Sequence, residues 1–147
     1  MPNEKANDAD FLSEIYRGAK MGVETIDTIM PKVESKKMMD ELLREQSEFR
    51  KFEEKAQGVL TRHNVEPKSI NKMQEMSSWI GIQMNTAIDS STSHIADLLM
   101  QGNQMGVIGI TKTKNKHPKA NEDITKLADE LVKMQENNIE KLKSFLG

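Results

Sequence analysis

The sequence predicts an all-α fold, a four-helix bundle with an additional crossover helix between bundle helices two and three. The 147 residues include only 4 prolines and 8 glycines, helix-forming residues dominate, and β-branched residues never form alternating runs. Apolar residues instead recur at the spacing of a helix that buries one face. The length suits one domain with a substantial core.

Five helices are expected within one helical domain, residues 9–147, after a disordered tail at residues 1–8. The longest stretch without an obvious break runs from Pro67 to Asn115, and a single helix of that length would extend far beyond its neighbours. The polar run Asp89–Ser93 competes for backbone hydrogen bonds, so it is expected to interrupt this stretch. The expected helices are residues 9–31, 35–63, 69–88, 93–113 and 121–146.

Short polar residues mark the expected helix starts. Asp8 or Asp10 can cap the first helix, Ser35 the second and Asn121 the last, because their side chains accept hydrogen bonds from the unpaired N–H groups of the first turn. Pro31 ends the first helix or lies in its last turn.

The last expected helix has polar residues within its apolar stripe. Gln135 and Asn138 lie at the border and in the middle of this stripe, where apolar residues are expected. Such residues either support a site or fix the register of the helix. The apolar positions of the stripe are Ile124, Leu127, Leu131, Met134, Leu142 and Phe145.

The first, second, fourth and fifth helices are expected to form two antiparallel hairpins joined by the crossover, which is a known bundle topology. The chain resembles the ferritin-like superfamily, in particular its small bacterial members that lack the di-iron ligand motifs. The residues that carry this resemblance are Leu12, Ile15 and Tyr16, then Met30-Pro31-Lys32, Glu45-Gln46 with Phe49, and the closing segment Met134–Leu146.

The resemblance implies where metal ligands would lie. Di-iron members carry a Glu on two helices and Glu-x-x-His on the other two. The matching positions here are Gln135 and Asn138 on the last helix and Gln46 and Phe49 on the second, which are amides and an aromatic ring. The metal site is therefore expected to be lost. We expect a core polar cluster of Gln46, Gln135 and Asn138 in its place, with no cofactor.

An alternative is iron bound by shifted ligands. Glu45 and Glu48 share the i,i+3 spacing that brings two side chains to one helix face, with Glu45 nearer the core and Glu48 further out. These two carboxylates are the candidates if a metal is bound.

The stretch from Met76 to Thr111 carries formal charges only at Asp89 and Asp97. Helices with so little charge are either wrapped by their own domain or shared with a second subunit. We therefore expect a homo-oligomer. Its candidate interface residues are Trp79, Gly102, Gly106 and Gly109.

Composition disfavours other partners and compartments. The net charge is -2 with acids and bases interspersed, so no nucleic-acid partner is expected. No apolar stretch suits a membrane span, and the absence of cysteine fits a reducing cytoplasm.

Three roles follow from these patterns. The first is a non-enzymatic helical protein that acts by self-association or by binding a partner, because no catalytic motif has informative spacing. The second is an iron-binding or oxidase-type relative with shifted ligands. The third is a carrier of a small apolar ligand in the bundle core.

Overall fold

The computed structural model describes residues 4–66 and 91–147, and all regular structure within these residues is helical. This confirms the all-α class and four bundle helices. The helices are α1 (Glu4–Ile29), α2 (Lys36–Arg62), α4 (Thr92–Lys116) and α5 (Glu122–Leu142), with short 3₁₀ turns at Met30–Lys32 and Lys143–Phe145.

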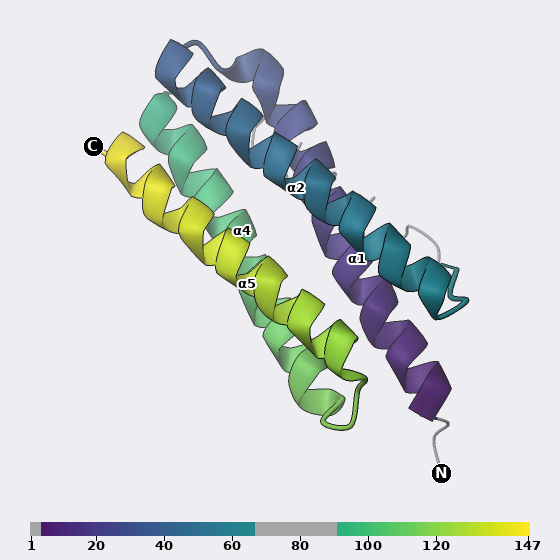
Figure 1. The fold of residues 1–147 in the computed structure, drawn as a ribbon. Helices are drawn as coiled ribbons and strands as arrows, with labels where there is room; N and C mark the ends of the chain where they lie inside the picture. Colours follow the sequence, from purple (N-terminus) through teal and green to yellow (C-terminus); the bar gives the residue numbers. More distant parts are fainter. Residues whose placement is uncertain (1–3, 67–90) are drawn as a thin grey trace.

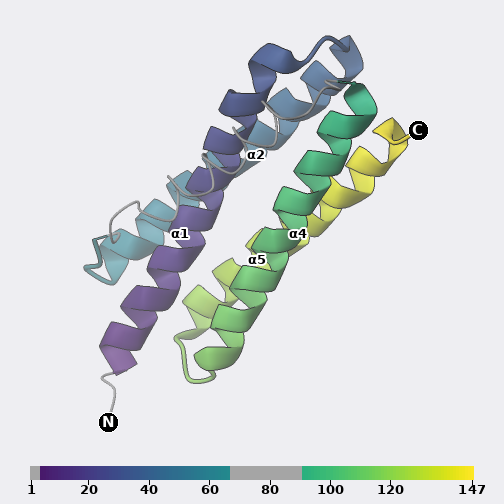
Figure 2. The ribbon, with the colours of Figure 1, turned by 180° about the vertical axis from the view of Figure 1, so that it is seen from behind.

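The helices form two hairpins, α1 with α2 and α4 with α5, which pack side by side (Figures 1 and 2). His63 follows α2, and its Nε2 lies 2.8 Å from Oδ2 of Asp123 at the start of α5. Phe11 lies near the start of α1 and stacks on His117, which follows α4, with ring centroids 5.3 Å apart. Helix α2 is thus antiparallel to α5, and α1 to α4. Consequently α2 ends and α4 begins at opposite ends of the bundle (Figure 1).

The expected crossover helix, residues 69–88, and Trp79 lie outside the described residues. A break was predicted at residues 89–93. The start of α4 at Thr92 agrees with this prediction. Ser91 is the N-cap of α4, and its Oγ accepts a hydrogen bond from the His94 amide at 3.2 Å.

Ser35 caps α2 as predicted, since its Oγ accepts a hydrogen bond from the Met38 amide at 3.2 Å. The predicted start of the first helix was wrong. Residues 4–8 are helical rather than a disordered tail, so neither Asp8 nor Asp10 is the cap. This segment includes Glu, Lys and Ala, all strong helix formers, and it continues the α1 helix toward the N-terminus.

All four helices contribute to one continuous apolar core. The stripe predicted on the last helix is confirmed, because Ile124, Leu127, Leu131 and Leu142 are all buried. Among the described residues, none of the helices has the combination of length and apolar character that a membrane crossing requires.

Candidate functional site

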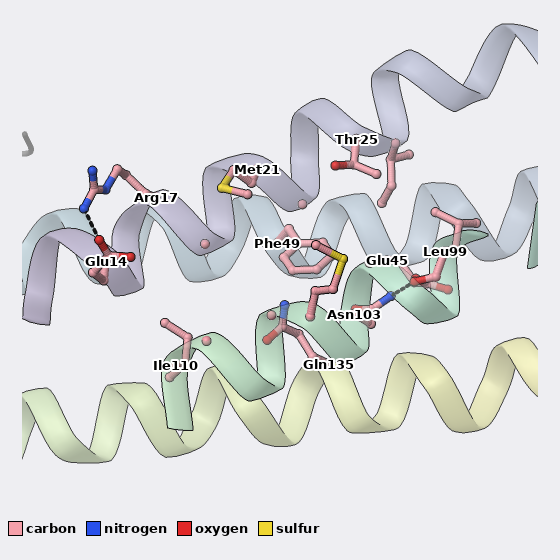
Figure 3. A pocket seen from close by; sticks show the side chains of 17 residues that line it. Glu14, Arg17, Met21, Thr25, Glu45, Phe49, Leu99, Asn103, Ile110 and Gln135 are labelled. Carbon is pink, nitrogen blue, oxygen red and sulfur yellow. Dashed lines mark hydrogen bonds and ion pairs between the residues drawn. The ribbon is translucent and has the colours of Figure 1, made fainter. Parts of the chain in front are cut away.

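A cavity of about 540 Å³ lies between α1 and α4 (Figure 3). The side chains of Phe49 and Glu45 reach it from α2, and Gln135 reaches it from α5. All four described helices therefore contribute to this one space. The apolar residues that line it are Met21, Ile26, Phe49, Leu99, Met105 and Ile110.

Glycines line the cavity on both facing helices. Gly18 and Gly22 line it from α1, and Gly102, Gly106 and Gly109 line it from α4. A Cβ atom added at Gly102 or Gly109 would meet no atom of a described residue within 4 Å. Within the described part of the chain these two positions therefore border free space, and no close contact there requires a glycine.

Two other glycines permit close contacts. A Cβ at Gly22 would lie 2.6 Å from the ring of Phe49, and a Cβ at Gly106 would collide with the amide of Gln135. The absent side chains at these positions allow Phe49 and Gln135 to lie against the backbones of α1 and α4. Both side chains are thereby directed toward the cavity.

Glu45 is the most unusual group in the cavity. It is fully buried, and no described neighbour donates a hydrogen bond to either of its carboxylate oxygens. Its closest polar neighbour is a second carboxylate, Glu41, one turn earlier on α2. Burial raises the pKa of Glu45 to about 10, and the interaction with Glu41 acts in the same direction.

The two carboxyl groups differ in protonation at neutral pH. Burial also acts to raise the pKa of Glu41, but the interactions with Glu45 and Arg44 outweigh it, so the pKa of Glu41 is lowered. The pKa of Glu45 is raised well above neutrality. At neutral pH we therefore assign Glu45 as neutral and Glu41 as ionised.

Buried amides continue this polar group across the core. Arg44 Nη2 donates to Asn138 Oδ1 at 3.2 Å, and Asn138 Nδ2 donates to Asn103 Oδ1 at 3.5 Å. Asn103 Nδ2 in turn donates to the carbonyl of Leu99 at 2.9 Å. Gln135 stands apart, since its Oε1 is buried and receives no hydrogen bond from a described residue.

Gln135 and Asn138 of the predicted polar cluster are buried on α5 as expected, but no hydrogen bond among the described residues joins them. Gln46 is also buried, but its Nε2 donates to the Val23 carbonyl at 3.1 Å and to Asp27 Oδ1 at 2.6 Å. Gln46 therefore joins α2 to α1 and is not part of the cluster, because it faces α1 while Glu45 faces the cavity.

The two candidate metal ligands do not converge. Glu45 is enclosed in the core, whereas the side chain of Glu48 is 45% exposed and its carboxylate lies 4.0 Å from Lys51 Nζ. The described residues contain no group of three His, Asp or Glu side chains that could hold a metal ion. Iron binding through Glu45 and Glu48 together is not supported by this geometry.

The candidate interface glycines Gly102, Gly106 and Gly109 all line the cavity. Their place in a subunit interface stays a prediction. Self-association stays a prediction, as does membership of the ferritin-like superfamily.

Asn103 was missed in the sequence. It is buried on α4, whereas the neighbouring amides Gln101 and Gln104 are exposed. The sequence could have identified Asn103 as buried, because Leu99, Asn103 and Ile110 recur at the spacing of one helix face. The ion pair between Glu14 and Arg17 at the other end of the cavity was also missed.

The comparisons with known proteins gave no match: no protein-family model, curated protein or solved structure is similar to this chain.

Proposed function

We propose that this chain is a binding protein for a small, largely apolar ligand held between α1 and α4. The observation that carries the proposal is the cavity of about 540 Å³, lined mainly by apolar side chains with a few buried polar groups. Ligand pockets of proteins commonly have volumes of roughly 300–1,000 Å³ and this balance of lining.

The glycines on α4 support this role. A glycine inside a helix costs about 1 kcal/mol relative to alanine. Gly102 and Gly109 carry this cost although no described residue near them would exclude a side chain. These two glycines leave space that a ligand would use.

The polar groups are unevenly distributed along the cavity. Glu45 and Asn103 lie toward one end, the Glu14–Arg17 ion pair lies toward the other, and Gln135 lies between them (Figure 3). A ligand with an apolar body and one polar group would be held in a single orientation by such a lining.

Filling the cavity tests the proposal. The neutral fluorescent probe N-phenylnaphthylamine should bind the full chain saturably, with one molecule per chain. Gly102→Leu or Gly109→Leu should weaken binding at least about tenfold, which corresponds to about 1.4 kcal/mol, because the new side chain would occupy the free space.

Gly58→Leu is the matched control. Gly58 is exposed on α2, a Cβ there would meet nothing within 4 Å, and it does not line the cavity. This variant should bind the probe as the wild type does, and all three variants should unfold cooperatively. Unchanged binding in both cavity-filling variants would contradict the proposal.

A further inference from the structure

We infer that the ligand carries a basic amine, and that its ammonium group binds the carboxylate of Glu45. This inference rests on the proposed function and deepens it by naming the chemical class of the ligand. It is carried by two buried acceptors that line the cavity and receive no hydrogen bond from any described residue.

The first acceptor is Glu45. Its side chain is fully buried, it lines the cavity, and neither oxygen receives a hydrogen bond from a described residue. The second is Oε1 of Gln135, which is buried in the same lining and is equally without a donor. Buried acceptors without partners are rare and costly, at about 1–3 kcal/mol each. A ligand that satisfies them must present N–H or O–H donors.

Among the described residues, the cations near the cavity do not donate a hydrogen bond to Glu45 or to Gln135 Oε1. Arg44 is engaged by Glu41, with its Nε and Nη2 at 3.2 and 2.6 Å from the carboxylate oxygens, and by Asn138. Lys141 on α5 acts on Glu45 only through its charge. Arg17 on α1 is paired with Glu14. The α4 residues that line the cavity carry no charge.

The charge balance favours an ammonium over a neutral donor. Glu41 and Glu45 together offer two carboxyl groups on adjacent turns of α2, and Glu45 is the one that faces the apolar space. An ammonium group in this space forms charge-assisted hydrogen bonds, which are roughly twice as strong as neutral ones. A hydrated metal ion is disfavoured because the lining is mainly apolar.

Binding releases one proton. In the free protein Glu45 is neutral. When the ammonium enters, Glu45 ionises, its proton leaves to solvent, and the carboxylate accepts an N–H bond from the ligand. The ligand keeps its own proton throughout. Below the pKa values of both partners, the affinity should therefore rise about tenfold for each unit of pH.

The experiment compares two probes of the same shape on the full chain. Isothermal titration calorimetry is run with cyclohexylmethylamine and with the neutral cyclohexylmethanol, at pH values between roughly 6 and 9 and in buffers of different ionisation enthalpy. The amine should bind more tightly as the pH rises and release one proton. The affinity of the alcohol should not change with pH.

Two variants identify the carboxylate. Glu45→Gln should lose the preference for the amine, the proton release and the pH dependence, while the alcohol still binds. Glu48→Gln is the matched control on the same helix, because the Glu48 side chain is 45% exposed and outside the cavity lining. It should behave as the wild type does.

The outcomes separate the two proposals. If N-phenylnaphthylamine and the alcohol bind but the amine shows no preference and no proton release, the inference is overturned and the proposed function stands. If none of the probes binds, both are overturned. The pH dependence is read from the wild-type protein, so the inference is tested even if a variant fails to fold.

Discussion

At the scale of single residues, Glu45 makes the stability of the protein depend on pH. Its pKa in the folded protein is raised from 4.5 to about 10 by burial and by Glu41. Between these two values the folded state keeps a proton that the unfolded state has released. The stabilising contribution of Glu45 is therefore complete below the unfolded value and is lost as the pH rises toward the folded value. Glu41 acts in the opposite sense, because its pKa is lowered, and its contribution is lost as the solution becomes strongly acidic.

Glu45→Gln removes this titration. The variant should gain stability relative to the wild type as the pH is raised from about 5 to about 8, by roughly 1–3 kcal/mol. The measurement is the free energy of unfolding from urea titrations at both pH values. A difference between the two proteins that does not change with pH would show that Glu45 is already ionised in the folded state.

The two buried amides of α5 should respond differently to substitution. Asn138 is fully buried and hydrogen-bonds both Arg44 and Asn103, so Asn138→Leu should cost about 1–3 kcal/mol. Gln135→Met keeps the volume and removes an oxygen without a donor, so it should be neutral or stabilising by up to about 1 kcal/mol. Thermal unfolding of both variants checks this order, and a larger loss in Gln135→Met would show that this amide is bonded.

At the scale of the helices, glycines determine how closely neighbouring elements approach. Gly22 lets the ring of Phe49 on α2 lie against the backbone of α1, and Gly106 does the same for Gln135 against α4. A side chain at either place would push the helices apart or turn the contacting group out of the cavity.

Alanine substitutions distinguish this role from simple helix propensity. Gly22→Ala should lower the free energy of unfolding by about 1–3 kcal/mol, because its Cβ would lie 2.6 Å from the buried, rigid ring of Phe49. Gly58→Ala on the exposed face of α2 should instead raise it by about 0.5–1 kcal/mol. Urea unfolding midpoints measure both, and a stabilised Gly22→Ala protein would rule out the close contact.

At the scale of the whole molecule, two hairpins share one apolar core. Their contacts include the stacked pair Phe11 and His117 and the ion pair between Lys55 and Glu130, whose charged atoms are 2.6 Å apart. The polar chain from Arg44 through Asn138 to Asn103 also crosses from α2 to α5 and α4. Neither hairpin can separate without exposing this core.

The chain should consequently unfold in one cooperative transition. The unfolding enthalpy near the midpoint should be roughly 100 kcal/mol, given about 0.7 kcal/mol per residue. The ratio of the van't Hoff to the calorimetric enthalpy should be close to one. Differential scanning calorimetry measures both quantities. Two separate transitions would show that the hairpins unfold independently.

The sequence by itself determined the all-α class, the two antiparallel hairpins and the apolar stripe of α5, because these follow from local periodicity and capping. Ser35 and the break before α4 could be identified for the same reason, since a cap bonds within its own first turn. Gln135 and Asn138 were recognisable because they interrupt a regular stripe.

Only the tertiary structure decided which neighbouring helix or cavity each buried polar side chain faces. Gln46 and Glu45 are adjacent in the chain and both are buried, yet one bonds to α1 and the other lines the cavity. The direction of each depends on how α2 is rotated against three neighbours, which no local pattern encodes. The cavity is likewise a property of the packed helices together, because Gly102 and Gly109 of α4 leave space next to α1 only where the fold brings these two helices side by side.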